Sequence, residues 1–301
     1  MAGICAGRVV IVTGAGRGLG RSYALAFARE GARVVVNDLG TSLAGEGRDL
    51  STAQAVVDEI RAAGGEAVAN GEDVSEWDSA ARIVGAALEH FGGLDVVVNN
   101  AGFVRDRMFV SATLAEWDAT MKVHLRGHFC VARHAVDYWR ASAKQGKPVD
   151  ARIINTSSGA GLNGSIAQAA YSAAKGGIAS LTLVQAAELG RYGITANALA
   201  PAARTRMTEQ AFAERMKRPA SGFDVQDPDN VAPLVVWLGS AESRAVTGCV
   251  FEIEGGKIML DDGWHDGPMI DKQARWEPRE VGAAVASLIG RRRTPKKVYG
   301  T

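Results

Sequence analysis

The sequence predicts an α/β fold in which a doubly wound parallel sheet carries helices on both faces. Short apolar runs rich in Val and Ile recur along the chain, as is typical of strands buried on both faces. Segments with helical periodicity lie between these runs, and several end at a glycine. The predicted strands are 8–13, 33–38, 66–70, 94–99, 152–157, 194–199 and 249–253. The predicted helices are 18–30, 51–63, 75–91, 115–141, 168–190 and 229–239, with one more over 280–289.

Composition narrows the class of protein. The 301 residues are 47% hydrophobic and 22% charged, which suits one globular domain. A net charge of +1 gives no field that would attract nucleic acid, and no apolar run is long enough for a membrane span. The three cysteines lack the spacing of a disulfide framework or a metal site, so we expect a cytoplasmic protein without a metal.

A glycine-rich loop, TGAGRGLG, follows the first predicted strand and opens a helix. Unpaired N–H groups at a helix N-terminus bind phosphates, and glycine lets the backbone approach them closely. The loop lacks the Gly-Lys-Ser/Thr of a nucleoside-triphosphate site, which favours a dinucleotide. The predicted contacts are Gly14, Arg17, Gly18, Leu19 and Gly20.

The second predicted strand ends at Asp38, which lies 18 residues past Gly20. A carboxylate there accepts hydrogen bonds from the adenosine ribose and repels a 2′-phosphate, so NAD is favoured over NADP. Arg17 leaves NADP open, because its guanidinium is able to bind a 2′-phosphate.

The third and fourth predicted strands end at the same edge of the sheet. Asp73 and Val74 follow the third strand, where Asp73 is expected to reach the adenine amino group. Asn100, Ala101 and Gly102 follow the fourth as further cofactor contacts, and the small residues Ala101 and Gly102 are expected to let the ribose and nicotinamide side pass close to the backbone.

A candidate acid/base pair lies at the start of the predicted helix 168–190. Tyr171 and Lys175 are four residues apart, which places both on one helix face. A nearby cation is expected to lower the pKa of the phenol and make Tyr171 usable for proton transfer. Ser158, at the end of a strand, is positioned to hydrogen-bond a substrate oxygen.

Together these motifs resemble the short-chain dehydrogenase/reductase family over roughly residues 7–256. The resemblance implies a Rossmann-like domain over 1–256 with a seven-stranded sheet, a C-terminal extension over 257–301, and a homodimer or homotetramer. It implies that Tyr171 moves the proton, that Lys175 also binds the nicotinamide ribose, and that Ser158 orients the substrate.

Two positions depart from the family pattern. His124 stands where the family usually has an Asn whose backbone carbonyl holds a relay water, and we include it among the catalytic candidates. The usual Pro-Gly after the sixth strand is Pro201-Ala202, followed by Ala203, so Pro201 and Ala203 are expected to contact the nicotinamide with altered detail.

A narrower resemblance links VVVNDLG, GFVRDRMF, VHLRG and NVAPLVVWL to the dehydrogenase domain of the peroxisomal D-specific multifunctional enzymes. It implies a (3R)-3-hydroxyacyl-CoA or a 17β-hydroxysteroid as the secondary alcohol. Segment 207–218 and the tail from residue 264 are then expected to cover the substrate. Arg105, Arg107 and Arg204 are candidates for a CoA phosphate.

Two alternatives remain open. One is a 3-oxoacyl-acyl carrier protein reductase, which Asp38 disfavours because such reductases usually use NADPH. The other is a catalytically silent dinucleotide-binding protein, which is disfavoured because Ser158, Tyr171 and Lys175 are all present.

Overall fold

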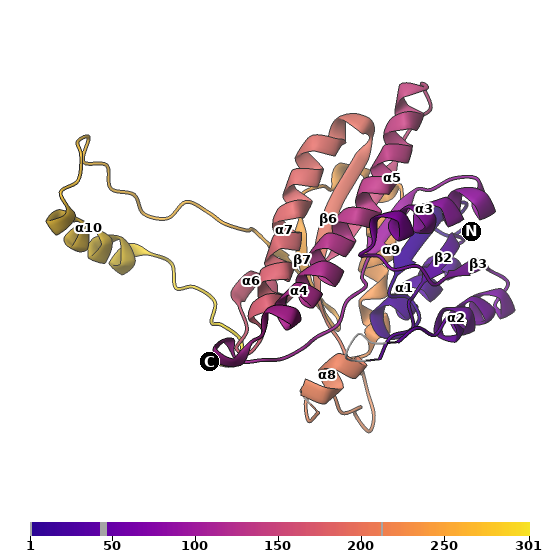
Figure 1. Ribbon diagram of the computed structural model, residues 1–301, viewed down its shortest axis with the longest axis horizontal. Coiled ribbons are helices and arrows are strands. Elements are labelled where there is room, and N and C mark those ends of the chain that lie inside the picture. The colour runs from indigo at the N-terminus through magenta and orange to yellow at the C-terminus, as the bar shows by residue number, and fades with distance from the viewer. Residues whose placement is uncertain (1, 43–46, 212) are drawn as a thin grey trace.

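The computed structural model describes residues 2–42, 47–211 and 213–301 (Figure 1). The seven predicted strands form and lie parallel in one sheet, in the order β3-β2-β1-β4-β5-β6-β7, which confirms the predicted fold class. Their bounds are β1 (Val9–Thr13), β2 (Arg33–Asn37), β3 (Glu66–Asn70), β4 (Val96–Asn99), β5 (Ala151–Thr156), β6 (Ile194–Ala202) and β7 (Val250–Glu254).

An eighth strand, β8 (Lys257–Asp261), extends the sheet beyond the seven that the family resemblance implied. It pairs antiparallel with β7 through a tight turn in which Gly255 has a positive φ of 56°. The strand belongs to residues that follow 256, so part of the predicted extension is joined to the sheet by backbone hydrogen bonds.

Helices cover both faces of the sheet because side chains along each strand point alternately to opposite sides. Val10 and Val12 of β1 pack with α1, α2 and α9, whereas Val9 and Ile11 pack with α3 and α5. The helices are α1 (Gly18–Arg29), α2 (Ser51–Ala62), α3 (Trp77–Phe91), α4 (Leu114–Met121), α5 (Gly127–Lys144), α6 (Gly159–Asn163), α7 (Ala169–Leu189), α8 (Arg206–Ala211), α9 (Ala232–Gly239) and α10 (Pro278–Arg291).

The helix predicted over 115–141 is not a continuous α-helix. A π-helical segment, Lys122–Arg126, separates α4 from α5. Such π segments widen a helix locally and often occur at functional sites. His124 lies within it, so the altered geometry is centred on one of the candidate residues.

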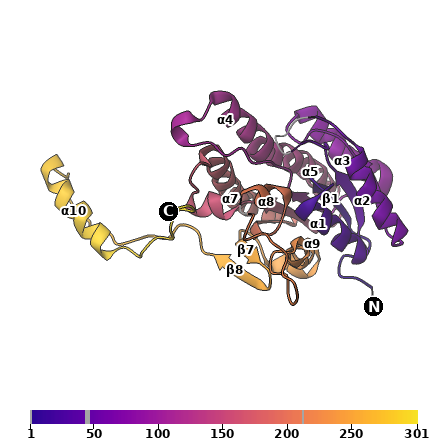
Figure 2. The same cartoon turned by 90° about the horizontal axis from the view of Figure 1, so that it is seen from below.

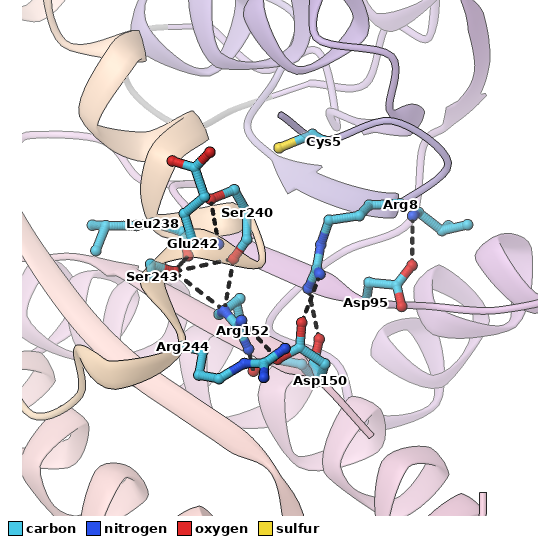
Figure 3. Close-up of polar contacts among 12 residues, drawn as sticks. Cys5, Arg8, Asp95, Asp150, Arg152, Leu238, Ser240, Glu242, Ser243 and Arg244 are labelled. Atoms are coloured by element: carbon cyan, nitrogen blue, oxygen red, sulfur yellow. Dashed lines mark hydrogen bonds and ion pairs between the residues drawn. The ribbon is translucent and has the colours of Figure 1, made fainter. Parts of the chain in front are cut away.

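The N-terminal ends of the strands carry a network of charges centred on the buried Arg152 (Figure 3). Arg152 at the start of β5 is 1% exposed and donates to Ser240 O, at 3.0 Å, and to Asp150 Oδ1, at 2.7 Å. Arg8 donates to Asp150 Oδ2, at 3.0 Å. This network joins the N-terminal ends of β1 and β5, at the end of the sheet opposite the predicted site.

The C-terminal tail leaves the body after β8 and carries α10, which stands clear of the sheet in both views (Figures 1 and 2). No residue of α10 is buried in the described structure. The chain then returns to the body, and its last residues lie near the start of α7. No helix in the described part of the chain combines the length and apolarity needed to cross a membrane; the cytoplasmic location stays a prediction.

Candidate active site

The candidate site lies where the strand order reverses, between β1 and β4. Open parallel sheets bind ligands in the crevice at this point, beyond the carboxyl ends of the strands. A cavity of about 240 Å³ occupies it. The predicted cofactor residues that line this cavity are Gly14, Arg17, Gly18, Leu19, Gly20, Asp38, Asp73, Val74, Asn100, Ala101 and Gly102.

The remaining predicted cofactor residues do not line the cavity. Pro201 and Ala203 lie at the end of β6, and Ala203 is buried. Tyr171 and Lys175 lie on α7. The cavity is also lined by residues that the sequence analysis did not name as cofactor contacts: Asn37, Leu39, Thr41, Ser42, Glu72, Phe103, Val123, Thr205, Arg206 and Met207.

Glycine is required at two positions of the loop. Gly14 has a φ of 63°, and a Cβ there would lie 2.8 Å from the Ala101 Cα. A Cβ on Gly20 would lie 2.1 Å from the Gly14 carbonyl oxygen. The loop is therefore packed against its own first turn and against the segment after β4, which leaves its N–H groups beside the cavity.

The Asp38 carboxylate is held by backbone amides on both sides. Gly16 N donates to Oδ2, at 2.8 Å, and Gly40 N donates to Oδ1, at 2.7 Å. Arg17 and Arg206 also line the cavity, and Asp38 acts on Arg206 through its charge. The carboxylate thus lines the same cavity as two cations.

Asp73 lines the adjoining part of the cavity. Its Oδ1 accepts hydrogen bonds from Ser75 N, at 2.8 Å, and Ser75 Oγ, at 2.7 Å. These hydrogen bonds hold the turn that precedes α3 and fix the orientation of the Asp73 carboxylate.

Ser158 and Tyr171 are brought together by β5 and the first turn of α7. The Ser158 hydroxyl accepts a hydrogen bond from Ala160 N, at 3.2 Å, and so caps α6. The Ser158 side chain also acts on the Tyr171 phenol, whose pKa it lowers. The end of β5 and the first turn of α7 thus bring the serine and the phenol close together.

The expected direction of the Tyr171 pKa is wrong. Burial raises the pKa of the phenol, the hydrogen bond from Ser158 lowers it, and the charge of Asp106 raises it further. The cation that was expected to lower it points elsewhere: Lys175 Nζ donates to Thr156 O, at 2.6 Å, and lies 5.6 Å from the Tyr171 ring centroid. Burial lowers the pKa of Lys175 itself to about 7.

His124 lies behind Tyr171, with the two rings edge to face at 5.2 Å between centroids. Its Nε2 lies 2.7 Å from the Phe103 carbonyl oxygen and 3.2 Å from the Phe103 amide nitrogen, so the tautomer decides whether this nitrogen donates or accepts. Burial, reinforced by the charge of Lys175, lowers the pKa of His124 to about 3. The imidazole is therefore neutral, and a Cβ on Gly102 would lie only 2.3 Å from its Cε1.

The arginines predicted for a CoA phosphate differ in their surroundings. Arg204 is buried and paired with Asp224, so it is no surface cation. Arg107 pairs with Glu116, at 3.0 Å, and the guanidinium of Arg105 lies 5.0 Å from the Phe103 ring centroid. Of the segment 207–218, Met207 lines the cavity, and residue 212 lies outside the described residues.

A glycine-loop crevice at the switch point of a parallel sheet, beside a Ser, a Tyr and a Lys, defines the class of nicotinamide-dependent dehydrogenases. The family model described as short chain dehydrogenase matches residues 8–216. The chain belongs to the short-chain dehydrogenase family and is an NAD(P)-dependent oxidoreductase that acts on CH–OH groups.

Relatives span most of the chain. It is 43% identical to hydroxyacyl-CoA dehydrogenase ChsB1 of Mycobacterium tuberculosis, over 95% of this chain and 90% of that one. It is 44% identical to peroxisomal multifunctional enzyme type 2 of Mus musculus, over 93% of this chain but 34% of that enzyme. A crystal structure of a short chain dehydrogenase from Mycobacterium avium is 60% identical, covers 99% of this chain and 100% of that one, and superposes with a TM-score of 0.90.

Proposed function

We propose that the protein oxidises a (3R)-3-hydroxyacyl-CoA to the 3-oxo thioester with NAD⁺, through Ser158, Tyr171 and Lys175. The observation that carries the proposal is the arrangement of three side chains: Ser158 acts on the Tyr171 phenol, and the buried Lys175 Nζ lies 5.6 Å from the Tyr171 ring centroid, beside the glycine-loop crevice. The hydroxyacyl-CoA activity in the name of the Mycobacterium tuberculosis relative supports the thioester class.

The residues present fit a dinucleotide. A Cβ on Gly14 or Gly20 would clash with backbone atoms, so glycine keeps the loop closely packed, and the loop opens α1, whose N-terminus favours a pyrophosphate. Asp38 would hold the adenosine ribose, and we infer NAD over NADP because its carboxylate faces the cavity. Arg17 and Arg206 are the groups that would favour NADP instead. When bound, the nicotinamide accepts the hydride from the substrate carbon.

The chain's own residues would accept the hydroxyl proton of the substrate and orient its hydroxyl oxygen. In its phenolate form Tyr171 would accept the hydroxyl proton as the hydride leaves, so the substrate becomes a ketone and the phenolate becomes a phenol. Ser158 hydrogen-bonds the same oxygen and keeps it facing Tyr171. Lys175, which Thr156 O orients, would contact the nicotinamide ribose.

Pro201, Ala203 and His124 complete the proposed site. Pro201 lies near the end of β6, Ala203 directly follows the strand, and both would border the nicotinamide carboxamide. His124 contributes its backbone position within the π segment and a neutral ring that supports Tyr171.

A 17β-hydroxysteroid is the second candidate substrate, because the same centre accepts any secondary alcohol that fits. A 3-oxoacyl-acyl carrier protein reductase is less favoured, since Asp38 opposes NADPH. A silent binding protein is less favoured because Ser158, Tyr171 and Lys175 lie together.

The test is NADH formation with (3R)- and (3S)-hydroxyacyl-CoA thioesters, 17β-hydroxysteroids and, in the reverse direction, 3-oxoacyl thioesters with NADPH. Turnover of the (3R) thioesters with NAD⁺ is expected. Preference for the steroids would move the substrate to ring alcohols, and faster reduction with NADPH would favour the reductase.

We also propose a homodimer or homotetramer. Phe129 on α5 and Leu183 and Val184 on α7 are 45%, 51% and 49% exposed, and Phe129 and Val184 line a shared hollow between the two helices. Apolar surface of this kind is typical of protein interfaces. Light scattering would give the mass, and a monomer would contradict the proposal.

A further inference from the structure

The last residues of the tail form backbone hydrogen bonds with the segment that joins α6 to α7. Tyr299 N donates to the Gly164 carbonyl, at 3.1 Å, and Ile166 N donates to the Tyr299 carbonyl, at 2.9 Å. Ser165 and Tyr299 form a parallel bridge. Two backbone hydrogen bonds thus fix the last residues of the described chain next to the helix that carries Tyr171.

The Tyr299 ring lies against the turn that carries Ser158. A Cβ on Gly159 would lie 2.6 Å from the Tyr299 hydroxyl and 2.9 Å from Cε2. Gly159 is the residue directly after Ser158, so the absence of a side chain there makes room for the ring. The aromatic ring therefore stands one residue from the hydroxyl that is proposed to hold the substrate oxygen.

A second contact sets the position of the tail. Lys296 Nζ donates to Asp261 Oδ1 on β8, at 2.9 Å, and to Glu252 on β7, at 3.3 Å. These bonds hold the chain three residues before Tyr299, although the intervening α10 stands away from the body. Tyr299 itself is 47% exposed, so part of its ring is open to a ligand.

We infer that Tyr299 is a specificity-determining residue, whose ring forms a wall of the substrate site beside Ser158. The inference deepens the proposed function and rests on it. Ser158 and Tyr171 hold the reacting oxygen, so one substituent of the same carbon must pass the turn at 158–166. A flat ring against Gly159 leaves room for an unbranched acyl chain and collides with a wide ring system.

The experiment compares kcat/KM for straight-chain (3R)-hydroxyacyl-CoA thioesters with that for bulky secondary alcohols, 17β-hydroxysteroids included. Tyr299→Ala should raise the ratio of bulky to straight substrates about tenfold, mainly through KM. Tyr299→Phe should keep the wild-type ratio, because the wall is the ring and not the hydroxyl. Lys297→Ala, another change in the tail, is the matched control. An unchanged ratio in Tyr299→Ala overturns the inference.

A double-mutant cycle with Gly159→Ala tests the contact itself. Alone, Gly159→Ala should displace the ring and reproduce the Tyr299→Ala profile. In the Tyr299→Ala background it should change little, since the clash is gone. Additive effects of the two substitutions would contradict the contact.

A measurement without substrate separates this inference from the proposed function. The Ile166 amide should be protected from hydrogen exchange in the wild type and lose protection when residues 299–301 are deleted. A freely exchanging Ile166 amide overturns the placement of Tyr299. If the thioesters are inert and another alcohol reacts, the proposed substrate is wrong, and the size profile is measured with that alcohol.

Discussion

Lys175 Nζ donates a hydrogen bond of 2.6 Å to the Thr156 carbonyl oxygen. Thr156 ends β5 and stands two residues before Ser158, so the strand that positions the serine also orients the ammonium. Because Lys175 is 2% exposed, its nitrogen has little freedom to turn away. The distance between the lysine and the phenol is thus set by the packing of α7 on β5.

Replacing Tyr171 by Phe removes the only proposed proton acceptor at the reacting oxygen. We expect kcat to fall about 10³-fold while NADH affinity, measured by fluorescence, stays within a factor of about three. Tyr138→Phe, a partly buried tyrosine on α5, is the control and should keep full activity. Retained turnover in Tyr171→Phe would mean that another group moves the proton.

Asp38→Asn keeps the oxygen that accepts from a backbone amide but removes the negative charge. We expect the preference for NAD⁺ over NADP⁺, as a ratio of kcat/KM values, to fall at least about tenfold, which corresponds to about 1.4 kcal/mol. The second measurement is Arg17→Ala in the same background, which should weaken NADP⁺ selectively. An unchanged ratio in Asp38→Asn would contradict the assignment of Asp38 to the ribose.

Stability should fall in mild acid because two histidines are buried without charge. Burial lowers the pKa of His124 to about 3 and that of His128 well below its usual value. The unfolded chain binds these protons near pH 6.5. The stabilisation is therefore complete above pH 6.5 and is lost as the pH falls toward the folded pKa, by up to about 1.4 kcal/mol per pH unit for each histidine.

Urea unfolding between pH 6.5 and pH 5 measures this slope. His124→Asn should remove about one histidine's share, whereas His265→Asn should leave the slope intact because His265 is exposed in the tail. Equal slopes in His124→Asn and the wild type would show that His124 is protonated in the folded protein.

Asp150→Ala should destabilise the protein without changing its chemistry. The substitution leaves the buried Arg152 without its carboxylate partner, which we expect to cost about 2 kcal/mol. Asp137→Ala breaks an exposed pair on α5 and should cost less than about 1 kcal/mol. The free energy of unfolding in urea and kcat/KM are both measured for Asp150→Ala. A fall in kcat/KM that matches the fall in stability would place the network in the catalytic function.

The contribution of this network to stability also depends on pH, through the Asp150 carboxylate. Burial raises the pKa of Asp150, but hydrogen bonds from Arg152 and Arg8 outweigh this and hold it below its usual value. Its contribution is therefore present above about pH 4, the unfolded value, and is lost at lower pH as the carboxylate protonates. In Asp150→Ala this part of the acid transition should disappear.

The strands and the glycine loop were predictable because their signals are local. Continuous apolar runs mark strands buried on both faces, and the loop directly follows one of them. The strand β8 was missed because Ile258, Met259 and Leu260 lie on the sheet edge and are exposed, so they lack a one-faced alternation. The pair Gly255-Gly256 before it was a usable hairpin signal.

The rest of the site depends on contacts between distant segments. Arg206 is the first residue of α8 and lines the cavity, and no spacing in its own neighbourhood indicates this. The pKa of Tyr171 reflects burial by several elements, whereas the spacing of four to Lys175 suggested only the charge. The contact between Tyr299 and Gly159 joins residues that are far apart in sequence, which a pattern search does not reveal.

The charge network of Arg8, Asp150 and Arg152 and the proposed reacting groups lie at opposite ends of the same strands. A strand of this length separates them by roughly 17 Å, beyond the Debye length at physiological ionic strength. In directed evolution, substitutions near the charge network can therefore be selected independently of substitutions near the proposed reacting groups. Variants that broaden the substrate range could be combined with stabilising changes at the far end, with little interference between the two sets.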